Sequence, residues 1–488
     1  MRCDRLGMRT LPLVALLLTP MILRAAATNS RPPNVLFLLI DDMGYGDLTC
    51  YGDKRVHTTN VDRLAAEGIR FTQFSVASPI CSPSRTGLMT GQYPARWRIT
   101  SYLSTRKENA DRGMAQWLDP SAPTLARQLK AAGYTTGHFG KWHMGGQRDV
   151  GDAPLLTEYG FDKTLTTFEG LGDRVLPLMD AYDGKPARKY GLGIMSEKLG
   201  RGNVTWVERS KVTTSFADAA LDFIKQAEKE NKPFYVDLWP DDVHSPFFPP
   251  KSLRGDGSKK DLYLGVVQAT DDQVGPLLDY IRNSPTLREN TLIVVASDNG
   301  PEPGAGSAGP FRGHKGNLYE GGFREPFIVW GPGLLSKSAI GTTNKETVVA
   351  GVDFLPSILA IAGTHPAPGE LVDGEDLSAS LLGREQAHRS KPLFWIRPPD
   401  RPGPANDPFP DLAVRDGDWK LLIDEDGTKP QLYDLAKDIR EANNLVSEKP
   451  EIVERLKKTV LDWRKTLPVR PLSQSAQGPR VDLKNDAG

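Results

Sequence analysis

The five residues from Cys81 to Arg85 read Cys-Ser-Pro-Ser-Arg, and they open a segment that predicts a helix through Met89. A proline such as Pro83 is favoured in a first helical turn, because a backbone N–H there has no partner within the helix. A group at position 81 would then lie at the positive end of a helix, where a developing anion is stabilised. Arg85 lies one turn later and can point back to the same place. The pattern therefore predicts a site at which negative charge develops.

Two pairs of oxygen-bearing side chains follow apolar runs elsewhere in the chain. Asp41 and Asp42 come directly after one run, and Asp298 and Asn299 follow closely after another. Oxygen ligands without cysteine or histidine neighbours suit calcium or magnesium rather than zinc. Each pair could instead cap a turn or a helix. Together the two pairs favour a metal site, with Ca²⁺ as the first choice and Mg²⁺ as the alternative.

The elements that position these side chains form an alternating pattern. Four apolar runs predict strands buried on both faces, at Val35–Ile40, Phe234–Leu238, Leu292–Ala296 and the shorter Phe327–Val329. Helical patterns lie between them, at Val61–Glu67, Thr124–Ala132, Phe216–Gln226 and Gln268–Arg282. The alternation predicts an α/β fold with a large, mostly parallel or mixed sheet sandwiched by helices. Such folds place active sites beyond the carboxyl ends of the strands, where the polar clusters fall.

The composition changes to a Pro-rich stretch around residues 385–411, which indicates a boundary or a long loop. Beyond it, Asp416-Gly417 is a turn signal between two strand-like runs and predicts a hairpin. Ile452–Thr466 has helical spacing of apolar residues. We therefore expect a catalytic domain at residues 28–390, a smaller C-terminal α+β subdomain with an antiparallel sheet at 391–470, and a flexible tail at 471–488.

The N-terminus has the order of a secretory signal. Basic residues lead into the apolar run Leu11–Leu23, and small residues follow up to Ala27. The run is short for a membrane span, although a retained anchor is the alternative. We expect cleavage near Ala27, export to the periplasm or the medium, and no stable membrane anchor.

Composition excludes some partners and leaves one question about cysteine. Lys plus Arg and Asp plus Glu both total 61, so we expect no nucleic-acid partner. Only Cys50 and Cys81 follow the predicted signal, and an exported protein with two cysteines could form one disulfide. That alternative stays open beside a reactive role for Cys81.

Cys81 to Arg85, together with the following TGLMTG, resembles the signature of type I sulfatases, formylglycine-dependent enzymes of the alkaline phosphatase superfamily. The resemblance runs from about Asn34 to the C-terminal helix and includes GKWH at 140–143 and GHKGNLYEGGFREP at 313–326. In that family the cysteine is oxidised to formylglycine by a formylglycine-generating or sulfatase-maturing enzyme. The hydrated aldehyde carries two geminal hydroxyls. The resemblance implies an alkaline phosphatase-like fold and hydrolysis of sulfate esters by a sulfuric ester hydrolase.

The resemblance also implies roles for individual residues. An oxygen of the residue made from Cys81 completes the metal shell of Asp41, Asp42, Asp298 and Asn299. The resemblance implies that Lys141 and Lys315 bind the sulfate. It also implies that His143 hydrogen-bonds the diol and that His244 protonates the leaving alcohol. The metal and Arg85 favour one hydroxyl as the attacking alkoxide, and the second hydroxyl later expels sulfate.

Some points stay open at this level. Certain family members carry a further polar residue that touches the sulfate or metal shell, and no equivalent is identifiable between Gly160 and Val204. The other histidines that we considered are interpreted as structural or surface residues, namely His57, His138, His314 and His388. Alternatives to a sulfatase are a phosphodiesterase or phosphonate hydrolase on the same scaffold and a non-catalytic carbohydrate-binding protein.

The substrate is predicted only as a class. Export favours a sulfated polysaccharide or glycosaminoglycan-type sugar, as for N-acetylgalactosamine-6-sulfatase-like enzymes, over a simple aryl sulfate. Trp97, Trp117 and Trp206 could stack on a sugar ring, but tryptophans in loops more often serve packing. The segment Arg96–Asp119 follows the predicted nucleophile helix and could form one wall of the pocket.

Overall fold

The computed structural model describes Met1 and residues 31–180 and 185–468. The predicted signal segment beyond Met1 and the predicted tail at 471–488 therefore lie outside the described residues. From Pro32 onward the chain forms one compact unit, so the boundary expected at residue 390 stays a prediction. Within the described part, none of the helices is both long and apolar enough to cross a membrane.

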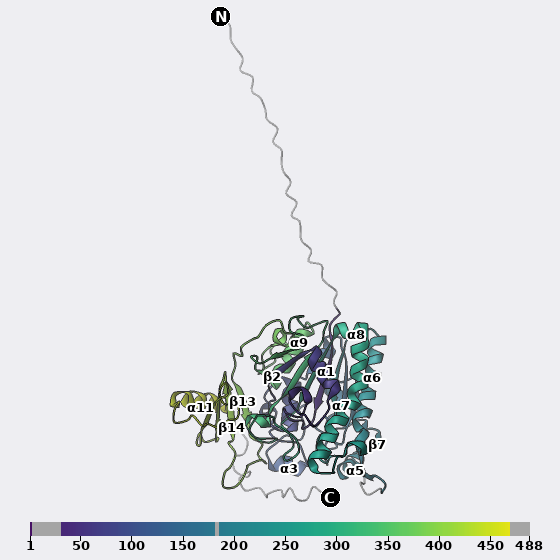
Figure 1. Ribbon diagram of the computed structural model, residues 1–488, viewed down its shortest axis with the longest axis horizontal. Coiled ribbons are helices and arrows are strands. Elements are labelled where there is room, and N and C mark those ends of the chain that lie inside the picture. Colours follow the sequence, from purple (N-terminus) through teal and green to yellow (C-terminus); the bar gives the residue numbers. More distant parts are fainter. Residues whose placement is uncertain (2–30, 181–184, 469–488) are drawn as a thin grey trace. The chain divides into compact units, whose positions relative to one another are not determined.

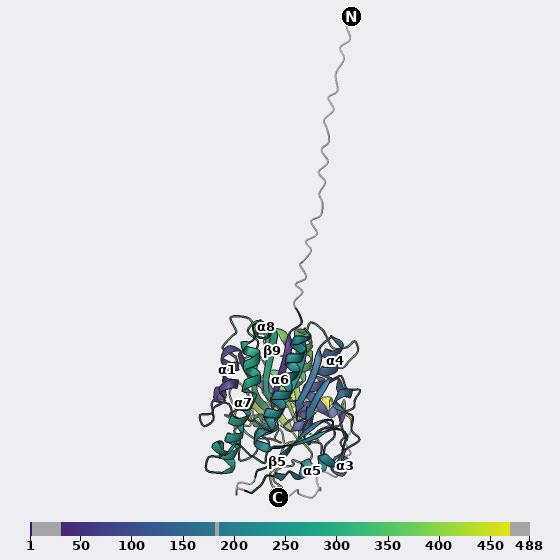
Figure 2. The same cartoon turned by 90° about the vertical axis from the view of Figure 1, so that its right-hand side faces the viewer.

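Strand β1 (Asn34–Ile40) shows why the sheet is covered on both faces. All seven of its residues are buried. Its odd-numbered residues from Val35 to Leu39 pack in one hydrophobic core, and its even-numbered residues from Leu36 to Ile40 pack in another. This follows from the two-residue period of a strand. Helices α1 (Thr59–Glu67), α6 (Val212–Lys229) and α7 (Lys259–Asn283) contribute to the second core, and α6 and α7 lie in front of the larger sheet in Figure 2. Helices α2 (Cys81–Thr90), α4 (Leu125–Ala131) and α9 (Phe354–Ile361) contribute to the first core.

The larger sheet is mixed rather than purely parallel. Within the described residues it has 12 strands in the order β11-β2-β10-β9-β1-β8-β3-β4-β5-β6, with β12 paired to β2 and β7 paired to β5. The four predicted strands are confirmed as β1, β8, β9 and β10, and β10 is antiparallel to both of its neighbours. The remaining bounds are β2 Ile69–Ser75, β3 Thr135–Gly140, β4 Lys163–Thr166, β5 Arg174–Met179, β6 Arg188–Lys189, β7 Val204–Glu208, β8 Phe234–Trp239, β9 Thr291–Ser297, β10 Arg324–Trp330, β11 Thr342–Asn344 and β12 Val349–Ala350.

The predicted helices are confirmed, including the one that opens at Cys81. Helix α7 begins at Lys259, earlier than its apolar pattern indicates, because the Ser258 hydroxyl accepts a hydrogen bond from the amide of Asp261 and caps the helix. The bounds are α1 Thr59–Glu67, α2 Cys81–Thr90, α3 Arg106–Asp111, α4 Leu125–Ala131, α5 Gly191–Lys198, α6 Val212–Lys229, α7 Lys259–Asn283, α8 Pro285–Asn290, α9 Phe354–Ile361, α10 Ser378–Leu381 and α11 Pro450–Lys465.

A smaller antiparallel sheet lies in the C-terminal part of the described chain, as predicted, and its first strand falls within the Pro-rich stretch (Figure 1). Its four strands are joined in chain order, and their bounds are β13 Leu393–Ile396, β14 Leu412–Asp416, β15 Trp419–Ile423 and β16 Gln431–Asp434. The expected hairpin joins β14 to β15, with Gly417 at its turn in the left-handed region at φ 61°. Helix α11 packs on this sheet through Val453, Leu456 and Val460.

A buried ion-pair cluster ties the smaller sheet to the loop before β10. The Nζ of Lys420, on β15, lies 2.9 Å from a carboxylate oxygen of Glu320 and 2.8 Å from one of Glu441. All three side chains have no exposed surface. Burial alone would raise the pKa of Glu320, but Lys420 and Arg324 lower it to about 2. The lysine thus holds a carboxylate ionised where water cannot reach it.

We expect Lys420→Met to lower the free energy of unfolding by about 3 kcal/mol, because it leaves the buried Glu441 without its cation and Glu320 with Arg324 as its remaining ion-pair partner. Urea denaturation of the purified protein measures the change. Lys437→Met is the matched control, since Lys437 pairs with Asp434 at the surface and exposed pairs contribute little. Equal stability of the two variants would contradict a stabilising role for the buried cluster.

Candidate active site

Four neighbouring strands end at the same edge of the larger sheet and bring the predicted residues together. In the order β9, β1, β8 and β3 they are all parallel. The register pairs Ile40 with Ser297, so Asp41 and Asp298 follow side by side. On the other side, the amide of Lys141 donates to the carbonyl of Trp239 at 2.9 Å. Sheet register therefore places the acidic pairs next to the basic segment after β3.

The acidic side chains form one buried group held by Arg85. Oxygens of Asp41, Asp42 and Asp298 lie within 4.8 Å of one another, and none of the three residues is exposed. The Arg85 Nη2 lies 2.9 Å from an oxygen of Asp41 and 2.7 Å from one of Asp298. Its Nη1 donates to the Lys141 carbonyl at 2.7 Å. Arg85 thus reaches back from α2 to the strand ends, as its helical position predicts.

Two lysines approach the same group from opposite segments. Lys141 Nζ donates to Asp41 at 2.7 Å and lies 3.7 Å from the Cys81 sulfur. Lys315, in the loop between β9 and β10, donates to Asp42 at 2.6 Å. The Cys81 sulfur lies 3.9 Å from Asp42 Oδ1. Lys141, Lys315 and Cys81 therefore lie around the same carboxylates. The Cys81 sulfur marks the position that an oxygen of a modified residue 81 would take.

The protonation states are set by burial and by these cations. Burial alone would raise the pKa of Asp41, but Lys141 and Arg85 lower it well below its usual range. Burial, together with the neighbouring Asp41, raises the pKa of Asp298 to about 7. Burial also raises the pKa of the Cys81 thiol well above its usual range. An unmodified Cys81 is therefore a neutral thiol, which is a poor nucleophile.

The donor set fits a hard divalent cation. Three carboxylates converge at the strand ends, and the amide oxygen of Asn299 is buried with no hydrogen-bond partner among the described residues. The Asn299 Nδ2 donates to Asp42 Oδ1 at 2.7 Å, so the free oxygen belongs to the same group. Buried oxygens without partners are costly, and an oxygen-ligated ion such as calcium would satisfy this one.

His143 is held on one side by a residue that sequence reasoning missed. Its Nε2 lies 2.6 Å from Glu169 Oε2 and 2.9 Å from the Leu103 carbonyl, while its Nδ1 is buried without a partner in the described part of the chain. Burial lowers the pKa of His143 to about 4. Arg148 holds the other Glu169 oxygen at 2.8 Å. Glu169 falls between Gly160 and Val204, where no polar residue could be singled out from sequence.

His244 has a more open position. Its side chain is 33% exposed, its Nε2 lies 3.6 Å from Asp42 Oδ2, and its Nδ1 lies 2.7 Å from the Ser245 carbonyl. The loop that carries it is tied down by Arg209, whose Nη1 lies 3.0 Å from an Asp241 oxygen. The Nδ1 contact favours the tautomer with its proton on Nδ1, which leaves Nε2 to exchange a proton with a ligand.

Other predicted residues lie away from this group or have internal contacts. His138 is buried and its Nδ1 lies 3.4 Å from Asp237, in keeping with a structural role. Trp97 and Trp117 pack against hydrophobic clusters, and the Trp206 indole donates to Glu197 at 2.9 Å. Cys50 and Cys81 are both free, so the alternative of a disulfide between them is wrong.

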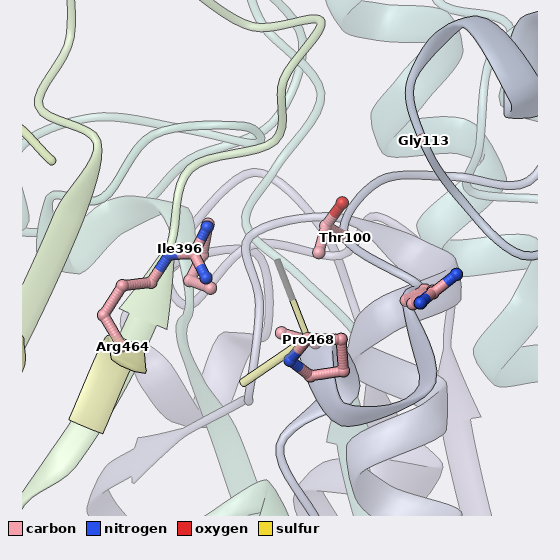
Figure 3. Close-up of a pocket in the computed structure, with 7 residues that line it drawn as sticks. Thr100, Gly113, Ile396, Arg464 and Pro468 are labelled. Atoms are coloured by element: carbon pink, nitrogen blue, oxygen red, sulfur yellow. The ribbon is translucent and has the colours of Figure 1, made fainter. Parts of the chain in front are cut away.

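A small pocket near the C-terminal subdomain is a separate feature (Figure 3). Residues that line it include Thr100, Gly113, Ile396, Arg464 and Pro468. Two of these belong to the segment at 96–119 that was considered as a pocket wall. None of the predicted catalytic residues lines this pocket, so it is not the site of the chemistry.

Comparison with known proteins gives one family. Residues 33–364 match the sulfatase family model. N-acetylgalactosamine-6-sulfatase of Canis lupus familiaris is 33% identical over 76% of this chain and 70% of its own length. Human arylsulfatase A is 30% identical over 90% of this chain and 89% of its own length.

The fold agrees with that match. A solved structure from work on the metabolism of multiple glycosaminoglycans by Bacteroides thetaiotaomicron superposes with a TM-score of 0.70. It is 25% identical and covers 90% of this chain and 100% of that one. The order of the strands, the convergence of residues at their ends and these similarities lead to one conclusion. The chain belongs to the sulfatase family and is a sulfuric ester hydrolase.

Proposed function

We propose that this chain hydrolyses sulfate esters of a sulfated carbohydrate, with residue 81 as formylglycine and Ca²⁺ as the bound ion. The observation that carries the proposal is the convergence of Arg85, Lys141 and Lys315 with three carboxylates around the Cys81 sulfur. Mg²⁺ is the alternative ion. Sequence similarity to N-acetylgalactosamine-6-sulfatase supports a sulfated amino sugar or a related glycan as the substrate class.

The proposed function requires a modified residue at position 81 and a bound divalent cation. A formylglycine-generating or sulfatase-maturing enzyme would oxidise Cys81, and the hydrated aldehyde supplies one hydroxyl as nucleophile and a second that releases sulfate without water attacking sulfur. Asp41, Asp42, Asp298 and Asn299 would hold the cation, with an oxygen of residue 81. When bound, such a cation polarises oxygens of the ester and favours deprotonation of a nearby hydroxyl.

The chain's own cations account for substrate binding. Lys141 Nζ lies 3.7 Å from the residue 81 sulfur, and Lys315 approaches from the opposite segment. Both would donate to non-bridging sulfate oxygens, where charge increases as the S–O bond breaks. Arg85 has no exposed surface and contacts two carboxylates. Its role is to fix the acidic group and the end of α2, rather than to enter the substrate pocket.

The two histidines would handle different protons. His143 is neutral above pH 4, and its Nε2–H donates to the Leu103 carbonyl at 2.9 Å, which leaves the lone pair on Nδ1 to accept from a hydroxyl of residue 81. His244 is partly exposed, and its Nε2, when the ring carries a second proton as imidazolium, would donate that proton to the departing alcohol oxygen. The residue that orients the diol is thus distinct from the residue that protonates the leaving group.

Replacement of Cys81 by serine tests the need for a diol. A serine hydroxyl can accept the sulfuryl group but has no second hydroxyl to expel it. We expect Cys81→Ser to lose turnover by roughly a thousandfold or more and to gain the mass of one SO₃ group after incubation with substrate, seen by intact-mass spectrometry.

Cys50→Ser is the control, because Cys50 is a free, half-buried cysteine outside the site. Undiminished turnover by Cys81→Ser, or an unmodified cysteine at position 81 in active native protein, would rule out the formylglycine. Parallel assays with an aryl sulfate and an aryl phosphodiester distinguish a sulfatase from a phosphodiesterase. The phosphodiesterase alternative requires faster turnover of the phosphodiester.

Removal of the ion tests the acidic group. Chelation followed by dialysis should abolish activity, and Ca²⁺ should restore it and raise the melting temperature, because a ligand at a hundred times its Kd stabilises by about 2.7 kcal/mol. Asp42→Asn should lose most of this thermal shift, whereas Asp462→Asn, a partly exposed carboxylate on α11, should keep it. If chelation changed neither the melting temperature nor the activity, the proposed metal would be excluded.

The buried His143 predicts a specific pH dependence of stability. Its pKa is about 4 when folded and 6.5 in the unfolded chain, so the unfolded state binds the extra proton between these values and stability falls as pH falls. We expect wild-type protein to lose about 3 kcal/mol more than His143→Gln between pH 7 and pH 4. Urea denaturation across this range measures it. His388→Gln, at an exposed position, should follow wild type, and parallel curves for all three proteins would refute the buried neutral histidine.

A further inference from the structure

Tyr102 connects the segment after α2 with the candidate active site. Its ring centroid lies 6.5 Å from that of His143. The next residue, Leu103, accepts a hydrogen bond through its carbonyl from His143 Nε2 at 2.9 Å. Tyr102 therefore lies beside the histidine to which the proposed function gives the diol of residue 81.

Arg401, in the Pro-rich stretch before β14, lies between Tyr102 and the loop of Lys315. Its Cζ is 5.5 Å from the centroid of the Tyr102 ring. Its Cγ and Cδ lie 3.2 Å from the position that a Cβ on Gly316 would take. The stem of Arg401 thus packs on the backbone of the residue after Lys315, and a glycine at 316 leaves room for it. The stretch around residue 401 therefore returns to the border of the sulfate site.

The guanidinium of Arg401 has N–H groups available for a ligand, whereas that of the neighbouring Arg112 does not. Its Nη1 lies 3.1 Å from Asp400 Oδ2, while its Nε and Nη2 have no hydrogen-bond partner among the described residues, and its side chain is 35% exposed. Arg112 also lies over Tyr102, at 4.7 Å. However, all three of its nitrogens are bonded, and it is 11% exposed. Arg401 is the member of this cluster that can accept a ligand.

The charge of the cluster favours an anion. Arg112 and Arg401 share one carboxylate, that of Asp400, so the Arg401 guanidinium is only partly neutralised by it. A planar guanidinium with two free N–H directions matches the two oxygens of a carboxylate or a sulfate. The Tyr102 ring beneath it holds the guanidinium by a cation–π contact. These features describe an anion subsite beside the lysines that would bind the reacting sulfate.

We propose that Arg401 binds a second anionic group of the substrate, either a uronate carboxylate or a further sulfate, next to the ester that is cleaved. This inference rests on the proposed function and narrows it to sugars that carry two negative charges. Arg401 acts as a specificity residue. The reacting ester is held by the lysines whether or not the second anion is present.

Three related substrates and three variants test the proposal. The substrates are N-acetylgalactosamine 6-sulfate, its disaccharide with a uronic acid, and N-acetylgalactosamine 4,6-disulfate. Arg401→Met keeps the stem that packs on Gly316, and Arg401→Lys keeps the charge without the planar fork. Arg455→Met is the matched control, since Arg455 lies on α11 and pairs with Asp416. Steady-state kinetics give kcat and KM for each combination of protein and substrate.

We expect Arg401→Met to reduce the ratio of kcat/KM for a doubly charged to a singly charged substrate by roughly tenfold, mainly through KM, since a charge-assisted pair is lost. Arg401→Lys should recover part of the ratio, and Arg455→Met should leave it as in wild type. The more affected of the two doubly charged substrates identifies the second anion as carboxylate or sulfate. An unchanged ratio in Arg401→Met would overturn this inference while leaving the proposed function intact. If wild type hydrolyses none of the three sugars, the proposed function fails first, and this inference fails with it.

Discussion

Six charged side chains share one small buried volume at the edge of the larger sheet, and this constraint governs the rest of the site. Three are the carboxylates of residues 41, 42 and 298, and three are the cations Arg85, Lys141 and Lys315. Buried charges are tolerated only when each has its partner in good geometry. The sheet meets this condition through register, because a slip of one residue between β1 and β9 would turn Asp41 away from Asp298. Packing on both faces of β1, in two separate hydrophobic cores, resists that slip.

The same burial divides the work between the two histidines. His143 lies in the closed part of the site and is 4% exposed, so desolvation keeps it neutral and the Leu103 carbonyl fixes its tautomer. His244 is 33% exposed, with Nδ1 at 2.7 Å from the Ser245 carbonyl and Nε2 at 3.6 Å from Asp42. A residue that must exchange a proton with a leaving group benefits from that access, whereas a residue that orients a nucleophile benefits from rigidity. The positions of the two side chains relative to solvent are therefore part of the proposed chemistry.

Residues whose positions follow from local patterns could be predicted from sequence, whereas those fixed by long-range side-chain contacts could not. Asp41 and Asp298 come at the ends of continuous apolar runs, and such runs predict buried strands whose ends share one edge. Strands β4, β6 and β7 gave no comparable signal, because short and partly exposed strands lack a continuous apolar run. Glu169 and Arg401 lie in loops, and their contacts join segments far apart in the chain. No periodicity connects residue 401 with residue 102, so only the folded chain brings them together.

The charge count also bears on which ligand the site prefers. When all three carboxylates are ionised, their charges balance those of the three cations, and an anionic ester would gain little from a group with no net charge. The proposed divalent cation would add two positive charges, matching the two negative charges of the sulfate product and exceeding the single charge of the bound ester. Interactions that grow as charge develops on the sulfate oxygens lower the barrier to reaction, whereas interactions equal in both states only tighten binding. Arg401 lies outside the carboxylate group and pairs with Asp400. It therefore affects which sugar is held, while the balance between the carboxylates, the lysines and the ion affects how fast the ester is cleaved.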